Sequence, residues 1–398
     1  MNDGESFNKK PRLLFCSSLY FHQKTSYIEI YKKHLEENFN VTYLDILSHF
    51  KSYGRKETEK NIKKKINQFE IICFTTDKPY YNFNFFKELK KINNQIVIVY
   101  TDGDAVTNFP AYCINFINEI DLYAVNDSLS VVNFLKRKNI NSILFTAVYN
   151  QDFYKIINRK KINDVIFYGG NDENRQNYLS YIKENNINLT LLGKGFNSYF
   201  TPIDQLNEQI NKSKIGLSLH TVVRKNWRNS FFNEFNKYKG IKGKNIEVPL
   251  SGTLLLAEYF DDLNHLYINK KEAIFFETKL EMIELIKYYL KNDEKREEIA
   301  QAGHLKALKN FEGNLMVKNL IKEINKIIFN KKKNITVLNY KIEKDYFVTW
   351  SLNYAFFFFA KKNFKSFFDM LKVVKYGVPI RYLIFKVKQK LLSIIFNI

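Results

Sequence analysis

The sequence predicts an α/β protein that contains two parallel, doubly wound sheets. Short apolar runs alternate with helical patterns along most of the chain, as parallel sheets with crossover helices require. A polar and basic stretch, residues 150–163, contains no apolar run and divides this alternation into two halves. With 398 residues, 45% of them hydrophobic, the chain is large enough for two cores. We therefore predict one domain over 1–155, a second over 156–330, and a tail over 331–398.

The first half contains six predicted strands with helices between them. The apolar runs predict strands over 11–19, 41–46, 70–75, 95–101, 121–126 and 142–146, and helices near 24–38, 51–66 and 128–139. The basic stretch 51–66 is expected to be a solvated helix. These alternating elements predict the first Rossmann-like domain.

The second half repeats the alternation. We predict strands over 164–168, 188–192, 215–220, 253–257 and 273–276, and helices over 174–185, 203–212, 245–250 and 279–291, followed by one more helix. Ligands of open α/β sheets bind outside the carboxyl ends of the strands. A functional site is therefore expected in a cleft that the two domains face.

The tail concentrates positive charge and aromatic side chains. The whole chain has a formal net charge of +21, and residues 331–398 hold 14 Lys and Arg against 3 Asp and Glu, together with 16 aromatic residues. We predict two or three helices here. The last begins at Ile380 and carries an apolar stripe close to a 3.6-residue period, with Arg381 and Lys388 off the stripe. Two interpretations remain open: a helical hairpin packed on the protein, and contact with an anionic membrane surface. Nucleic acid is a less favoured partner, because no nucleic-acid motif accompanies the charge.

The cellular compartment is inferred from what the sequence lacks. Three cysteines do not make a disulfide framework, so a reducing compartment is expected. The polar stretch from Met1 to Arg12 has no apolar core of a signal peptide. No uncharged apolar window is long enough to span a bilayer. We predict a cytoplasmic protein, with the tail as its candidate contact to the inner face of the membrane.

The richest motif is Lys244-Asn245-Ile246-Glu247-Val248-Pro249-Leu250-Ser251-Gly252-Thr253-Leu254-Leu255-Leu256. A carboxylate at Glu247 suits a ribose diol, because it accepts charge-assisted hydrogen bonds from two neighbouring hydroxyls. The start of the short helix that carries it suits a pyrophosphate. Lys244 is a candidate phosphate ligand, with a solvated loop lysine as the alternative. The candidate donor residues at the end of the motif are Ser251, Gly252 and Thr253.

Glu247-Val248-Pro249-Leu250-Ser251-Gly252-Thr253-Leu254-Leu255-Leu256 resembles the donor-site motif of group 1 glycosyltransferases, most closely the spore-maturation-type branch. The resemblance covers roughly residues 95–328 and continues through Glu258-Tyr259-Phe260-Asp261-Asp262-Leu263 to Gly303-His304. It implies the GT-B fold and transfer of a sugar from a nucleotide-diphosphate sugar to a glycan or lipid-linked acceptor, as in cell-surface polysaccharide synthesis. The alternative is a non-catalytic nucleotide-sugar or glycan-binding protein of the same fold.

The resemblance also implies further donor-binding residues. Gly169 and Gly170 follow the first strand of the second domain, at a turn where small residues let backbone approach an anion, although an ordinary tight turn has the same sequence. Arg175 lies on the next helix, where a phosphate-binding cation fits. His220 ends a strand and precedes a cationic loop that contains Arg224 and Arg228, for which phosphate contact and simple surface basicity are the two interpretations.

One position departs from the family pattern. Many retaining group 1 enzymes carry a second Glu eight residues before the ribose Glu, and this chain has Lys239 there. The segment 229–243 also differs in length. Both differences put the usual contact to the donor sugar in doubt and leave retention or inversion open.

Candidate catalytic residues lie in the first domain. Asp102 and Asp104 follow the strand 95–101, and His22 lies in the loop after the first strand. In a GT-B enzyme they would face the acceptor, where an Asp can serve as a base for its hydroxyl. Alternatives are a plain loop turn and a DxD metal site that bridges a diphosphate. No zinc spacing occurs among the cysteines and histidines, and we predict no metal and no cofactor.

Overall fold

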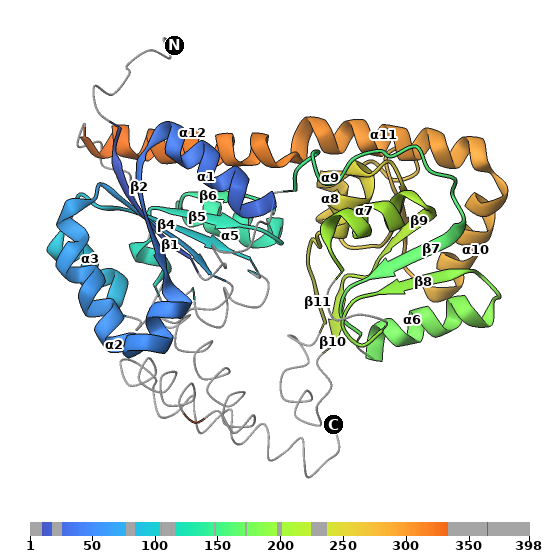
Figure 1. Cartoon of the computed structure of the whole chain (residues 1–398), viewed down its shortest axis with the longest axis horizontal. Coiled ribbons are helices and arrows are strands. Elements are labelled where there is room, and N and C mark those ends of the chain that lie inside the picture. The colour runs from blue at the N-terminus through green and yellow to red at the C-terminus, as the bar shows by residue number, and fades with distance from the viewer. Residues whose placement is uncertain are drawn as a thin grey trace.

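The computed structural model describes residues 10–17, 26–76, 84–103, 105, 113, 116–146, 149–171, 173–196, 201–223, 237–332 and 364. Within them, two α/β units lie side by side, and two long helices at the end of the described chain run along one side of both (Figure 1). The predicted α/β class with two Rossmann-like sheets is confirmed. The predicted tail helices lie outside the described residues, apart from Phe364. None of the described helices combines the length and apolar character that crossing a bilayer requires.

The first sheet has six parallel strands in the order β2-β1-β3-β4-β5-β6. The strands are β1 Arg12–Ser17, β2 Asn40–Asp45, β3 Ile71–Thr76, β4 Val97–Asp102, β5 Leu122–Val125 and β6 Ser142–Leu144. The helical segments are α1 Ser26–Asn38, α2 Ile46–Lys65, η1 Ile66–Gln68, α3 Phe85–Ile92, η3 Ile117–Glu119 and α5 Leu129–Arg137. β4 is buried along its whole length, as its run of Val, Ile and Tyr predicts for a strand covered on both faces.

The second sheet has five parallel strands in the order β13-β12-β9-β7-β8. The strands are β7 Asn163–Tyr168, β8 Leu189–Leu192, β9 Ser213–Ser218, β12 Leu254–Glu258 and β13 Ile274–Phe276. The helices are α6 Glu173–Glu184, α7 Ile203–Asn211, α8 Lys244–Leu250, α9 Leu263–Leu266, α10 Lys279–Lys291 and α11 Asp293–Phe311. A separate antiparallel pair, β10 Thr221–Val223 and β11 Lys237–Lys239, projects beyond β9.

The last long helix, α12 Gly313–Lys332, returns to the first domain. Its apolar face, which includes Val317, Leu320 and Ile324, packs into the core cluster formed by β1, β3, β4 and α1. Lys331 at its end pairs with Asp121 at 2.9 Å. This helix follows the second domain in the sequence, yet its apolar residues complete the core of the first domain. The periodicity of a helix identifies its apolar face but not the core that the face will cover.

Helix α3 and strand β11 are among the elements that were not predicted from the sequence. Helix α3 buries Phe85, Phe86 and Leu89. The segment preceding the motif helix includes strand β11, which pairs with β10. Both elements are short, and short elements give few periods from which to recognise a pattern.

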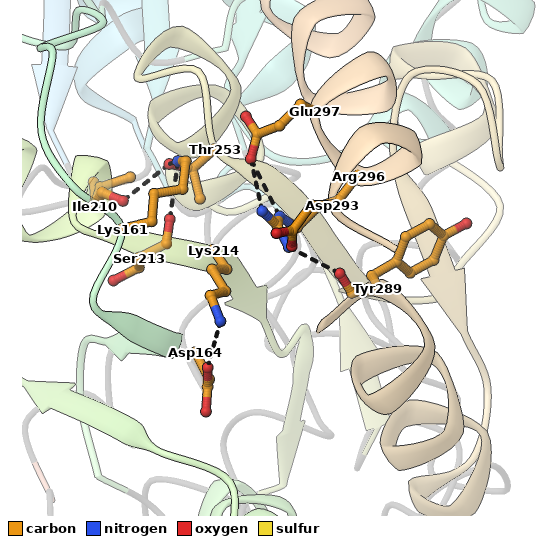
Figure 2. A network of polar contacts seen from close by, with 10 residues as sticks. All are labelled: Lys161, Asp164, Ile210, Ser213, Lys214, Thr253, Tyr289, Asp293, Arg296 and Glu297. Atoms are coloured by element: carbon orange, nitrogen blue, oxygen red, sulfur yellow. Dashed lines mark hydrogen bonds and ion pairs between the residues drawn. The ribbon is translucent and has the colours of Figure 1, made fainter. Parts of the chain in front are cut away.

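Polar contacts join the amino ends of β7 and β9, and a separate network of them surrounds Arg296 at the start of α11 (Figure 2). The guanidinium of Arg296 donates to the carbonyl oxygen of Tyr289 at 3.0 Å and pairs with Asp293 and Glu297. Arg296 is 4% exposed, whereas Asp293 is 73% exposed. Because the strands' amino ends lie opposite the expected ligand edge, this network serves the stability of the second domain.

Replacing Arg296 by alanine is therefore expected to lower the free energy of unfolding by about 1–3 kcal/mol, because the Tyr289 carbonyl loses its buried donor. Asp293→Asn is the matched control and should lower the free energy of unfolding far less, because its charge is exposed. Urea denaturation of both variants measures the difference. Equal losses of stability in the two variants would contradict a stabilising role for the buried contact between Arg296 and Tyr289.

Candidate functional site

Glu247 lies in the first turn of α8, at the carboxyl end of β7. Its Oε2 accepts a hydrogen bond from the Tyr168 hydroxyl at 2.7 Å, and its Oε1 accepts one from the Tyr154 hydroxyl at 3.1 Å. Tyr168 is the last residue of β7, and Tyr154 belongs to the segment that links the domains. The carboxylate is thus held from two sides before any ligand binds.

The carboxylate of Glu247 keeps capacity for further hydrogen bonds. Two carboxylate oxygens offer about four lone-pair sites, and the two tyrosines use two of them. Burial raises the pKa of Glu247, while the hydrogen bond from Tyr168, the charge of Lys244 and the hydrogen bond from Tyr154 oppose that rise. A buried acceptor with positioned partners and unused lone pairs suits a diol ligand.

The turn after β7 and the side chain of Lys244 meet beside Glu247. The Lys244 Nζ lies 4.9 Å from the centre of the Phe167 ring and 5.1 Å from that of Tyr168. A Cβ added at Gly169 would lie 3.3 Å from the same Nζ. The predicted residues Gly169 and Lys244, which are far apart in sequence, therefore come together around the end of β7.

Arg175 joins this group from α6. Its Nη1 donates to the carbonyl oxygen of Gly170 at 2.8 Å, and its guanidinium lies 5.9 Å from the Phe167 ring centre. The arginine therefore holds the glycine turn in place and adds a second cation to it. Together, Glu247, Lys244, Gly169, Gly170 and Arg175 form what we call the β7 cluster.

The backbone of the motif helix differs from the expectation of free amides. The amide of Asn245 bonds the carbonyl of Lys242 at 2.9 Å, and the amides of Ile246 and Glu247 bond the carbonyl of Gly243 at 2.8 and 2.9 Å. The tight turn that begins α8 thus already uses three of the amides that the sequence offered to a pyrophosphate.

The second half of the motif lies at the other end of α8. The Ser251 hydroxyl lies 2.7 Å from Asn207 Oδ1 and 2.8 Å from the Glu247 carbonyl oxygen, two acceptors for its one proton, and Thr253 donates to the carbonyl of Ile210 at 2.9 Å. Gly252 adopts φ +66°, as a helix-ending residue does. Ser251 thus reaches the backbone of Glu247 one turn back, whereas Thr253 bonds to α7. Their donor-binding role stays a prediction.

His220 is fully buried behind α8. Its Nδ1 lies 2.7 Å from the Glu258 carbonyl oxygen, and its Nε2 lies 2.9 Å from Asn245 Oδ1 and 3.1 Å from Ser218 Oγ. The Glu258 carboxylate accepts from the His220 amide at 2.8 Å and pairs with Lys239 at 3.3 Å. His220 thus links the end of β9 to the start of α8. Lys239, at the position of the family's second Glu, pairs with this buried carboxylate.

Burial lowers the pKa of His220 to about 4, so its ring is neutral at neutral pH. Between pH 6.5 and 4 the unfolded chain binds a proton that the folded protein does not. Stability is therefore expected to fall as pH drops through this range, by up to about 3 kcal/mol. Urea denaturation at pH 7 and pH 4.5 measures the loss. His220→Asn should flatten the pH dependence in this range, and an unchanged slope in that variant would contradict the assignment.

Of the first-domain candidates, Asp102 alone lies among the described residues. Asp102 is fully buried at the end of β4, where it accepts from the hydroxyl of Tyr123 and the thiol of Cys113. His22, Asp104, Arg224 and Arg228 lie outside the described residues. All five roles stay predictions. Within the described ranges, no group of three or more His, Cys, Asp or Glu side chains takes a metal-binding arrangement.

Sequence reasoning missed the two tyrosines that hold Glu247. Tyr168 carried a signal, because a polar group at the carboxyl end of a predicted strand belongs at the ligand edge. Tyr154 carried none, because it lies in an irregular segment 93 residues from its partner.

Part of the chain matches a known family, and the fold resembles several solved structures. Residues 175–321 match a family described as glycosyl transferase-like. Sucrose-phosphate synthase from Thermosynechococcus elongatus superposes with a TM-score of 0.54 at 10% identity, covering 81% of this chain and 100% of that one. HepE from Anabaena in complex with UDP-glucose superposes with a TM-score of 0.53 at 11% identity, covering 79% and 100%.

A glycosyltransferase from Rickettsia africae superposes with a TM-score of 0.50 at 12% identity, covering 81% of this chain and 100% of that one. No curated protein matches the sequence. The structural likenesses show that the fold is GT-B, as predicted. The family match over residues 175–321 supports a glycosyltransferase as the class of enzyme.

Proposed function

We propose that the protein transfers a sugar from a nucleoside-diphosphate sugar to a glycan or lipid-linked acceptor. The observation that carries this proposal is the buried Glu247 carboxylate, held by Tyr154 and Tyr168 with lone pairs to spare. It would accept from both hydroxyls of the ribose. HepE, which shares the fold, was solved with UDP-glucose and with UDP, and this supports a nucleotide sugar as the donor here.

Lys244, Arg175 and the Gly169–Gly170 turn would hold the diphosphate. As the sugar departs, negative charge grows on the diphosphate, and fixed cations stabilise charge that develops in a transition state. We propose that these side chains do this without a metal, with the loop containing Arg224 and Arg228 as a further source of cations. His220 would act from behind α8, by fixing Asn245 and the turn that begins the helix.

The acceptor would approach from the first domain, where His22, Asp102 and Asp104 are the proposed catalytic residues. The basic and aromatic tail, 331–398, would bring the enzyme to an anionic membrane surface on the cytoplasmic side. The order of motifs from Glu247 to His304 supports the spore-maturation-type branch and a role in polysaccharide synthesis.

A thermal-shift screen tests the proposal. The full chain is mixed with UDP, GDP, CDP, ADP or dTDP, each with Mg²⁺ and with EDTA. A nucleotide at 100 times its dissociation constant stabilises a protein by about 2.7 kcal/mol. We expect one of them to raise the melting temperature equally under both conditions. A shift that requires Mg²⁺ would contradict metal-independent binding, and no shift with any nucleotide would contradict the proposed donor site.

A further inference from the structure

A small polar pocket lies where the two domains meet. It has a volume of about 150 Å³. Its lining residues come from both domains, among them Asn126, Asp127 and Thr146 of the first and Ile241, Gly243 and Ile246 of the second. Hydrogen bonds join the domains beside it, from the Ile241 amide to the Asp127 carbonyl at 2.8 Å and from the Leu129 amide to Asp262 at 2.7 Å. The pocket is therefore part of the interface in the structure as it stands.

The first-domain wall of this pocket contains unsatisfied polar atoms. Thr146 is 1% exposed, and its hydroxyl has no hydrogen-bond partner among the described residues. The same holds for the Oδ1 of Asn126, and the buried carboxylate of Asp127 lines the wall beside them. An unpaired buried polar group costs free energy, so such groups in a pocket point to a ligand or to water that satisfies them.

The opposite wall presents two isoleucines beside Lys242. Ile241 and Ile246 come from the second domain, and both are buried. Gly243 lies between the pocket and the β7 cluster, and a Cβ added to it would lie only 3.0 Å from Glu247 Oε1. One wall thus offers hydrogen-bond acceptors and a hydroxyl, the other wall offers the side chains of two isoleucines, and the ribose-binding carboxylate lies next to both.

This combination matches a pyranose ring. A sugar presents hydroxyl donors along its edge and an apolar C–H face, and the pocket volume is of monosaccharide size. We propose that the pocket binds one sugar unit of the acceptor, with its hydroxyls on Asn126 and Thr146 and its C–H face on Ile241 and Ile246. The polar wall belongs to the first domain, on the acceptor side. The proposal rests on the proposed function and narrows the acceptor to a molecule whose reacting end is a sugar.

Methyl glycosides provide the probe. Methyl α- and β-D-glucopyranoside, galactopyranoside and mannopyranoside are each titrated into the full chain, and binding is measured by saturation-transfer NMR. At least one should bind the wild type. Thr146→Val keeps the shape and removes the hydroxyl, so the same glycoside should bind roughly 3- to 10-fold more weakly. Asn126→Ala should weaken glycoside binding in the same way.

The control variant is Thr101→Val. Thr101 is also 1% exposed with an unpartnered hydroxyl among the described residues, but it does not line the pocket. Glycoside affinity should stay at the wild-type value. The melting temperature of Thr146→Val without ligand should equal or exceed that of the wild type, because the change removes an unsatisfied buried group. A purely structural role for Thr146 would give the opposite result.

Several outcomes would overturn the proposal. The first is that no glycoside binds the wild type, which would leave water as the occupant of the pocket. The second is that Thr146→Val binds the glycoside as tightly as the wild type does. A third is displacement of the glycoside by UDP-glucose but not by UDP, which would assign the pocket to the donor sugar. If the glycoside binds through Thr146 but no nucleotide raises the melting temperature, the proposed function would be contradicted and the sugar subsite would still be supported.

Discussion

Replacing Glu247 by glutamine is expected to weaken nucleotide binding, and with it sugar transfer, by at least about tenfold. The carboxylate would accept two charge-assisted hydrogen bonds from the ribose, and such bonds are roughly twice as strong as neutral ones. Glutamine has nearly the same shape, but one oxygen becomes an amide nitrogen that donates instead of accepting. Titration calorimetry with the nucleotide that stabilises the wild type measures the loss.

Glutamine is preferred to alanine because of the two tyrosines. Alanine would leave the hydroxyls of Tyr154 and Tyr168 without their buried acceptor and would destabilise the site itself. Glu258→Gln serves as the control, since Glu258 is also buried in the second domain but pairs with Lys239 and the His220 amide. Equal weakening by both variants would indicate a general loss of structure and would contradict a direct role for Glu247.

Replacing Gly193 by alanine is expected to destabilise the protein by about 2–4 kcal/mol and to abolish nucleotide binding. Gly193 has φ +106°, and an added Cβ would lie 2.6 Å from the carbonyl oxygen and 3.0 Å from the nitrogen of Gly169. These are backbone atoms, so the clash can be relieved only by moving the turn after β7. That turn carries Gly170, to which Arg175 is bonded.

Gly54 is the matched control for this prediction. It also has a positive φ, +73°, but an added Cβ would meet nothing within 4 Å. Gly54→Ala should therefore show only the backbone strain, about 1–3 kcal/mol, with unchanged nucleotide affinity. Urea denaturation and calorimetry on both variants separate strain from clash. Wild-type nucleotide affinity in Gly193→Ala would show that the turn is not part of the donor site.

The fold could be predicted well from the sequence, because strands and helices are identified by patterns within short segments. Buried strands such as β4 are continuous apolar runs, and the motif helix lies between a lysine and a glycine that mark its ends. The destination of α12 was not predicted, because an amphipathic pattern does not name the core that it covers. Short elements such as β10 and β11 gave too few residues for a period.

The site was predicted in part. Five residues from three sequence segments form the β7 cluster, since each lies at the carboxyl end of β7 or at the start of a neighbouring helix. Ser251 and Thr253 adjoin Glu247 in sequence, but the helix carries them to its other end. The pocket residues Asn126 and Thr146 follow separate strands, and only the folded sheet brings them into one wall.

The measurement that tests the central claim most directly compares a nucleoside diphosphate with its 2′,3′-dideoxy analogue. Calorimetry on the wild type and on Glu247→Gln completes a four-way cycle that isolates the contact between the carboxylate and the ribose hydroxyls. The wild type should bind the dideoxy analogue at least about tenfold more weakly, and Glu247→Gln should bind the two ligands almost equally. An equal preference for the ribose hydroxyls in both proteins would contradict the assignment of Glu247 to the ribose.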